Sequence, residues 1–370
     1  MPLVVRRALL VALPPWLVSR ALTAAGLWVC WLRNGHRFPV SGHGAPGASG
    51  IWAWDAAWYR SIAEHGYAAQ LHPHGERFFP LFPLLGRCLG AVLGGHDGLA
   101  LVLVANAAAL AFGVGVAVFA RRELGEGAAV LATWLTLLAP GAVVLSIGYA
   151  EALAGVLAVA YLLAARSRGS ATWWAVPAGL LSGLARPTGL LLAVVPVVEL
   201  WLSRRDREAR PSRLALLSGA AAPVVGVGIF CVWTAAVDGD LLLPFTAQSA
   251  PGLRGGLFTN PVHGLFEAPN RSGLPVALRV GVVLVALALL VLTWRLLPRS
   301  IAVWATVFFL AAVTSAQATS LPRYLSADFP LLVALAGVLR GRLQGVLACG
   351  LSATAFTVVA VSGFGAGMLF

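Results

Sequence analysis

Eleven apolar segments, separated by short polar breaks, run through this chain of 370 residues. Hydrophobic residues make up 59% of the sequence and charged residues 11%, a balance that the surface of a water-soluble domain does not tolerate. Long apolar segments with few charges are typical of membrane-spanning helices. We therefore expect one all-α polytopic membrane domain over residues 1–370, with spans at about 8–32, 97–120, 128–147, 149–165, 172–185, 188–202, 214–236, 275–297, 300–317, 327–339 and 343–363.

The basic residues predict the orientation of these spans. All 26 are arginine, and the formal net charge is +12, which in a soluble protein would suggest a nucleic-acid partner. Here their positions follow the positive-inside rule, so we expect no nucleic acid and a multi-pass membrane protein in contact with membrane lipids. With a cytoplasmic N-terminus, fifteen arginines fall on the cytoplasmic face: Arg6, Arg7, Arg121, Arg122, Arg166, Arg168, Arg204, Arg205, Arg207, Arg210, Arg213, Arg295, Arg299, Arg340 and Arg342.

The same orientation places two long polar segments, 33–94 and 237–274, on the extracytoplasmic side. Within the first, residues 80–94 are apolar but short and are interrupted by proline and by Arg87, which predicts an interfacial or re-entrant helix. Both segments are rich in Gly, Pro and His in irregular order, as loops are.

An aromatic segment of the first loop, residues 52–67, is the sharpest local pattern. At helical spacing Trp54 and Trp58 share one face, and Tyr59 lies one turn after Asp55. One interpretation is an interfacial anchor in which Asp55 caps the helix. The other is a catalytic carboxylate beside aromatic side chains.

Three further ionisable side chains stand at the edges of apolar segments. Glu151, after Tyr149, begins the fourth span, and Arg186 precedes Pro187 between two short segments whose flanks are cytoplasmic, which predicts a helical hairpin. Arg323 lies in an external loop and breaks the positive-inside trend. The functional interpretation of Arg186 and Arg323 is phosphate binding, and that of Glu151 is a role in the functional site. The alternatives are a glutamate wetted in a first helical turn and an arginine that reaches lipid headgroups.

Metal and nucleotide motifs are weak or absent. His72, His74 and Glu76 form an H-x-H pattern without a helix or strand to set its geometry, so we expect no metal site. The sequence contains no P-loop and no G-x-S-x-G elbow, and its four cysteines show no C-x-x-C spacing. We expect no cofactor. Asn270 begins a glycosylation sequon, which matters only in a eukaryotic secretory system.

Taken in order, several motifs resemble the PIG-V family of glycosyltransferases, and in particular its bacterial, actinobacterial members. The resemblance covers residues 16–335 and rests on Trp54-Asp55 with Gly66-Tyr67, Phe78-Phe79-Pro80-Leu81-Phe82-Pro83-Leu84, Tyr149-Ala150-Glu151-Ala152-Leu153, Arg186-Pro187-Thr188-Gly189-Leu190 and Pro322-Arg323-Tyr324. It implies a GT-C architecture with an extracytoplasmic active site. It also implies a polyprenyl-phosphate sugar donor, mannose as the sugar, and Asp55 as the catalytic base.

With this resemblance, the predicted reaction is an inverting, metal-independent transfer. Asp55 would accept the proton of the acceptor hydroxyl, and Arg323 with Arg186 would stabilise the leaving phosphate. Further substrate contacts are predicted for Trp54, Trp58, Tyr59, Tyr149, Glu151 and Tyr324. The acceptor is a glycan, glycolipid or protein, and another polyprenyl-linked sugar, such as arabinofuranose, would use the same groups.

A multi-span transporter or lipid-linked sugar flippase is the alternative function. Transporters place ionisable residues and broken helices near the midplane and often show paired halves. This chain has one candidate break, at Arg186-Pro187, and no evident second copy. Its acidic candidates lie at the external edge, which favours chemistry at the membrane interface.

Overall fold

The computed structural model describes residues 3–40, 48–67, 74–203, 212–249, 260, 276–315 and 321–366. Within these ranges the chain is helical and has no β-strand, only an isolated bridge between Val40 and Ser49. This confirms the predicted all-α fold class. His72, Asn270 and most of the second external loop lie outside the described residues.

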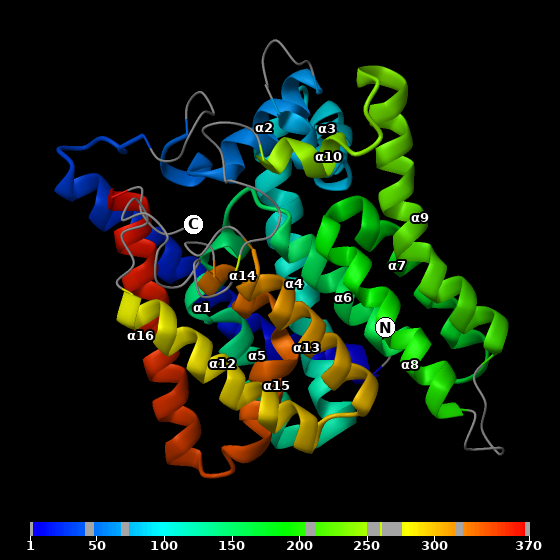
Figure 1. The fold of residues 1–370 in the computed structure, drawn as a ribbon. Helices are drawn as coiled ribbons and strands as arrows, with labels where there is room; N and C mark the ends of the chain where they lie inside the picture. Colours follow the sequence, from blue (N-terminus) through cyan, green and yellow to red (C-terminus); the bar gives the residue numbers. More distant parts are fainter. Residues whose placement is uncertain are drawn as a thin grey trace.

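Long apolar helices form the frame of the molecule (Figure 1). In the described ranges, five are long and apolar enough to cross a membrane: α1 (Leu3–Arg33), α4 (Asp97–Leu124), α9 (Arg213–Asp238), α12 (Val276–Leu296) and α16 (Arg342–Ala366). The predicted span 128–147 is instead a broken helix, because α5 (Glu126–Leu137) and the 3-10 helix η3 (Pro140–Ser146) meet at 77°. Proline has no N–H to continue the α5 hydrogen bonds, so the helix ends before Pro140.

The remaining apolar helices are shorter and pack among the long ones. A 15-residue helix is roughly 22 Å long, less than the ~30 Å hydrocarbon core, so the predicted number of about eleven spans is approximate. Arg186 and Pro187 separate two of these helices, and Pro187 begins the following 3-10 turn as predicted. The short elements are α6 (Glu151–Ala165), η4 (Gly169–Trp174), α7 (Ala175–Ala185), η5 (Pro187–Ala193), α8 (Val194–Ser203), α13 (Arg299–Val313) and α15 (Phe329–Val338).

Short helices form the predicted external loops, and three of them, α2, α3 and α10, lie together at one end of the bundle (Figure 1). The interfacial helix predicted at 80–94 is α3, which packs on α2 and α4, while α10 packs on α9 and η2. The predicted loop around Arg323 is in fact a helix, α14, that packs against η3. These elements are η1 (Gly50–Trp52), α2 (Asp55–His65), η2 (Gly75–Arg77), α3 (Leu81–Val92), α10 (Leu243–Thr246), η6 (Ala247–Ser249) and α14 (Leu321–Ala327).

An ionic cluster ties the helices together at their predicted cytoplasmic ends. Arg166, directly after α6, contacts Glu123 of α4 at 2.5 Å and Glu199 of α8 at 3.3 Å. The hydroxyl of Ser300, on α13, donates a 2.5 Å hydrogen bond to Glu199. Four helices are thereby held in register at the end of the bundle where the arginines predict the cytoplasm.

The crossing of α7 and α9 brings two backbones into direct contact. A Cβ atom built on Gly226 of α9 would collide with the carbonyl oxygen of Leu180, and one built on Gly183 of α7 would collide with that of Pro223. Small residues of this kind allow helices in membranes to approach closely. Because α7 leads directly to Arg186, this crossing also sets the position of that side chain.

We therefore expect Gly226→Ala to destabilise the protein by about 1–3 kcal/mol through overpacking. Gly228→Ala, two residues along the same helix, is the matched control, since a Cβ there meets no atom within 4 Å. Thermal unfolding of the detergent-purified variants measures the difference. Equal melting temperatures for the two variants would contradict the close crossing.

Candidate active site

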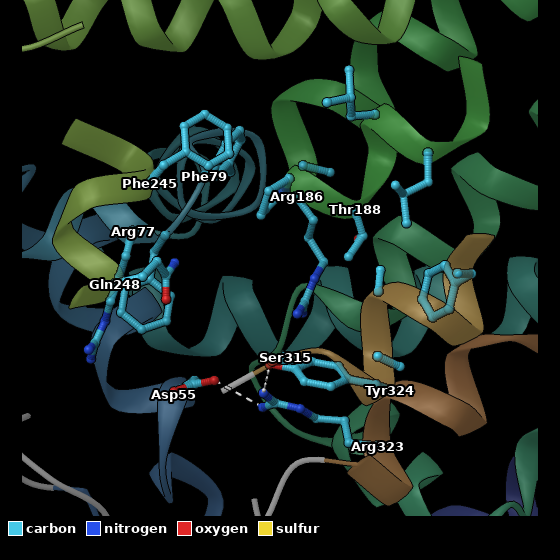
Figure 2. A pocket seen from close by; sticks show the side chains of 18 of the residues that line it. Asp55, Arg77, Phe79, Arg186, Thr188, Phe245, Gln248, Ser315, Arg323 and Tyr324 are labelled. Carbon is cyan, nitrogen blue, oxygen red and sulfur yellow. Dashed lines mark hydrogen bonds and ion pairs between the residues drawn. The ribbon is translucent and has the colours of Figure 1, made fainter. Parts of the chain in front are cut away.

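A cavity of about 300 Å³ opens among α2, the α7–η5 junction, α13, α14 and the short external helices. Figure 2 shows Asp55 and Arg323 close together, with Arg186 and Thr188 on one side and Arg77, Gln248, Phe245 and Phe79 on the other. Its lining consists of Asp55, Tyr59, Arg77, Phe78, Phe79, Ala185, Arg186, Pro187, Thr188, Leu190, Leu191, Phe245, Gln248, Phe308, Ala311, Ala312, Ser315, Arg323 and Tyr324.

Asp55 is the first residue of α2, and a side chain from a distant part of the sequence holds its backbone N–H. Its N–H donates a 2.9 Å hydrogen bond to the hydroxyl oxygen of Tyr149. The N-cap of the helix is Trp54, not Asp55, and Trp54 has φ of 55° and ψ of −126°. A bulky residue in this region is strained by about 1–3 kcal/mol, which the surrounding packing must offset. Trp54 is buried and stacks on Phe364 of α16, with ring centroids 5.4 Å apart.

Arg323 joins the carboxylates of two helices far apart in the sequence. Its Nη1 lies 2.9 Å from Oδ2 of Asp55, and its Nε lies 3.5 Å from Oε1 of Glu151. The side chain is 1% exposed, and its guanidinium lies 5.7 Å from the ring centroid of Tyr149 and 5.1 Å from that of Tyr324. A buried guanidinium needs paired acceptors, and these two carboxylates supply them.

Arg186 completes a chain of four charges. Its Nη1 lies 2.5 Å from the same Oε1 of Glu151 that Arg323 approaches. Asp55, Arg323, Glu151 and Arg186 thus form an alternating row in which two negative and two positive groups cancel formally. We call these four side chains the four-charge row.

The predicted site residues divide into two groups. Asp55, Tyr59, Arg186, Arg323 and Tyr324 line the 300 Å³ cavity. The structure places the other predicted contacts behind this wall. Tyr149 is fully buried, and Glu151 faces a smaller cavity of about 50 Å³ on the far side of Arg186 and Arg323.

Trp54 and Trp58 are also buried, so α2 does not present an aromatic face to lipid headgroups. Trp58 stacks on Phe78 with ring centroids 5.7 Å apart. The interfacial-anchor interpretation is wrong because α3, α4 and α16 cover α2. Burial raises the pKa of the Tyr59 hydroxyl, which therefore stays protonated and able to donate a hydrogen bond into the cavity.

Sequence reasoning missed several lining residues. Arg77 is a further arginine on the external side and stands directly before the Phe78-Phe79-Pro80 motif, so its departure from the positive-inside trend was a usable signal. Gln248 and Ser315 carried no such signal. Among the described residues, no three His, Cys, Asp or Glu side chains lie close enough together to hold a metal ion.

No protein-family profile and no curated protein matches the chain. Among solved structures, it resembles ArnT from Cupriavidus metallidurans bound to undecaprenyl phosphate, with a TM-score of 0.50 and 18% identity over 86% of this chain and 59% of that one. It is also similar to the Archaeoglobus fulgidus oligosaccharyltransferase in complex with Zn and sulfate (TM-score 0.49, 13% identity, 94% of this chain and 53% of that one). A third structure is the archaeal oligosaccharyltransferase AglB from Archaeoglobus fulgidus in complex with an inhibitory peptide and a dolichol-phosphate. Its TM-score is 0.48 and its identity 13%, over 95% of this chain and 56% of that one.

The chain thus spans between half and two thirds of the length of these structures. The likeness to ArnT, together with the apolar helices and their arrangement, shows that the chain has the GT-C fold of membrane glycosyltransferases. It is a multi-pass membrane protein. The more specific resemblance to the PIG-V family stays a prediction.

The four-charge row makes a stability prediction. Glu151→Gln leaves Arg186 and Arg323 buried with one carboxylate fewer, and breaking such a pair costs about 3 kcal/mol. Adding Arg186→Gln to that variant should recover part of the loss, because the excess positive charge is removed. Thermal unfolding of the single and double variants measures this coupling.

Glu64→Gln provides the control for that measurement. Glu64 forms a 2.7 Å pair with Arg60 on the surface of α2, where the side chains are 31% and 44% exposed. Surface pairs of this kind contribute little, so the melting temperature should barely change. An equally small effect of Glu151→Gln would show that the four-charge row does not stabilise the fold.

Proposed function

We propose that the protein is a glycosyltransferase that moves a sugar from a polyprenyl-phosphate donor to an acceptor on the extracytoplasmic side of the bacterial plasma membrane. The observation that carries this proposal is the position of Asp55, a carboxylate held by Arg323 on the wall of a cavity that Arg186 also lines. A base and phosphate-binding guanidiniums facing one space are what transfer from a sugar phosphate requires.

The lining of the cavity supports a lipid-linked donor. Leu190 and Leu191 of η5 line the cavity together with Phe308 and Ala311 of α13, so part of its wall is apolar and comes from the helices of the bundle. A polyprenyl chain would lie along this side with its phosphate at Arg186. That the structurally similar ArnT was solved with undecaprenyl phosphate supports the same class of carrier.

The reaction we propose is a single displacement with inversion at the anomeric carbon. The acceptor oxygen forms a bond to that carbon as the bond from the carbon to the phosphate oxygen breaks. The acceptor proton passes to the Asp55 carboxylate, and polyprenyl phosphate leaves with the bonding electron pair. Arg323 fixes the direction of the carboxylate through Oδ2, and Arg186 stabilises the charge that grows on the leaving phosphate.

The distribution of arginines supports the orientation. The cluster around Arg166 lies at the end of the bundle that the arginines predict to be cytoplasmic, and the cavity lies among the short helices of the predicted external loops. Mannose is the sugar that the resemblance to the PIG-V family favours, and a pentofuranose such as arabinofuranose is the alternative. Glycans, glycolipids and proteins are all candidate acceptors.

Asp55→Asn tests the proposed base. The variant keeps the shape of the side chain but cannot accept the proton, so we expect kcat to fall roughly 10²- to 10⁴-fold. Turnover of a labelled polyprenyl-phosphate sugar by the purified protein in nanodiscs measures this. The matched control is Asp238→Asn, at the exposed end of α9, which should keep wild-type turnover.

Two outcomes would contradict parts of the proposed function. Near wild-type turnover in Asp55→Asn would remove Asp55 from the role of base. Movement of the labelled lipid across vesicle membranes without any new glycosylated product would favour the transporter or flippase instead.

Arg186→Gln tests the donor phosphate site. The loss of one guanidinium contact to phosphate should raise the donor KM about tenfold or more, because such charge-assisted hydrogen bonds are strong. Initial rates over a range of donor concentrations measure it, with Arg60→Gln on the exposed face of α2 as the control. An unchanged donor KM would place the phosphate elsewhere in the cavity.

A further inference from the structure

Arg20 lies near the middle of the long helix α1 and lines neither of the two cavities. In the described part of the chain, the hydrogen bonds of this partly buried guanidinium run to neutral groups. Its Nε donates to Oδ1 of Asn106 at 2.8 Å, its Nη1 to the hydroxyl of Ser19 at 2.7 Å, and its Nη2 to the carbonyl of Leu145 at 2.5 Å. A charge within a membrane-spanning helix costs more than an apolar side chain there, so we expect these contacts to serve a function.

Two consecutive carbonyl groups at the end of η3 are held from α1 and α4. The carbonyl of Leu145 accepts from Arg20, and that of Ser146 accepts from Nδ2 of Asn106 at 3.2 Å. Because Arg20 also donates to Asn106, the two side chains act together, and we call them the α1–α4 clamp. Irregular backbone within a membrane bundle needs such partners for its polar groups. The clamp thus fixes the backbone at the point where α5 and η3 give way to α6.

Tyr149, the side chain that holds the backbone of Asp55, follows the clamp by three residues. The N–H of Tyr149 donates to the carbonyl of Ile147 at 2.7 Å, which makes a tight turn between η3 and α6. Its hydroxyl accepts the N–H of Asp55 at 2.9 Å, and the ring is fully buried. A close-packed ring has little room to adjust, so a displacement of the turn is transmitted to the hydroxyl and to Asp55.

We infer that Arg20 is a positioning residue of the proposed glycosyltransferase and acts through Tyr149 on the Asp55 base. It holds the end of η3, the turn holds Tyr149, and Tyr149 holds the first N–H of α2. A displacement of about 1 Å at a catalytic group costs on the order of 10²-fold in rate. This inference rests on the proposed function and adds to it a residue that lies outside the cavity.

Arg20→Met removes every donor of the side chain and keeps much of its length. With a labelled polyprenyl-phosphate sugar and the lipid and glycan extract of the producing cells as acceptor, we expect kcat in nanodiscs to fall roughly 10- to 100-fold. The donor KM should stay within about twofold of wild type, because Arg186 still lines the cavity. The matched control is Arg33→Met, at the exposed end of the same helix, which should keep the wild-type kcat.

Two further variants keep the test independent of the folding of Arg20→Met. Arg20→Lys keeps a cationic donor near the carbonyl of Leu145 and should lose less of kcat than Arg20→Met. Asn106→Leu removes the other half of the α1–α4 clamp and should reproduce the loss of kcat.

A double-mutant cycle tests the route through Tyr149. Tyr149→Phe removes the hydroxyl that holds the N–H of Asp55 but keeps the ring. The double variant with Arg20→Met should be no more than about threefold slower than the slower single variant, since both changes break one chain of contacts. Losses of kcat that multiply would overturn this route.

Hydrogen–deuterium exchange of the Asp55 amide gives a readout that does not depend on turnover. We expect its exchange rate to rise about fivefold or more in Arg20→Met and in Tyr149→Phe, because each variant loosens the same hydrogen bond. Unchanged exchange in Arg20→Met would overturn the inference.

Kinetics and melting temperature together separate the remaining outcomes. A wild-type kcat in Arg20→Met would overturn the inference, and a lower melting temperature beside it would make the residue structural only. If the wild-type protein transfers no sugar, the proposed function itself fails, whereas amide exchange still tests the link between Arg20 and Asp55.

Discussion

The buried guanidinium of Arg323 is the contact on which the rest of the site depends. It lies between Asp55 of α2 and Glu151 of α6, with 1% of its side chain exposed. A charge so far from water is tolerated only when its partners stay in place, so the ion pairs fix α2, α6 and α14 relative to one another. The same contacts hold the Asp55 carboxylate at the cavity wall. The ion pairs that stabilise the packing of the helices therefore also set the geometry of the site.

Interruptions in the apolar helices make room for this row of charges. The α7 helix ends at Arg186, where Pro187 starts a 3-10 turn, and α5 gives way to η3 before Tyr149 and Glu151. In an unbroken helix these polar side chains would instead face lipid or neighbouring helices, away from the cavity. Irregular backbone at the membrane edge is acceptable here because it is covered by protein or lines the cavity. The close crossing of α7 with α9 at Gly183 and Gly226 then holds the break in position.

The cavity has two chemical faces, and they follow from the origin of its walls. Bundle helices supply apolar side chains such as Leu190 and Phe308, whereas the short helices η2 and η6 supply Arg77 and Gln248. Asp55 and Arg323 form a further part of the same wall.

The sequence alone determined that the chain is an all-helical membrane protein, because continuous apolar segments satisfy their backbone hydrogen bonds in lipid by forming helices. It also singled out Asp55, Glu151, Arg186 and Arg323, since ionisable groups at the ends of apolar segments are costly. Only the tertiary structure decided that these groups touch: Asp55 and Arg323 are 268 residues apart, and no local pattern encodes which helix ends meet. It likewise decided that Trp54 and Trp58 are buried, because the same helical spacing fits a lipid interface and a protein core, and only packing distinguishes the two.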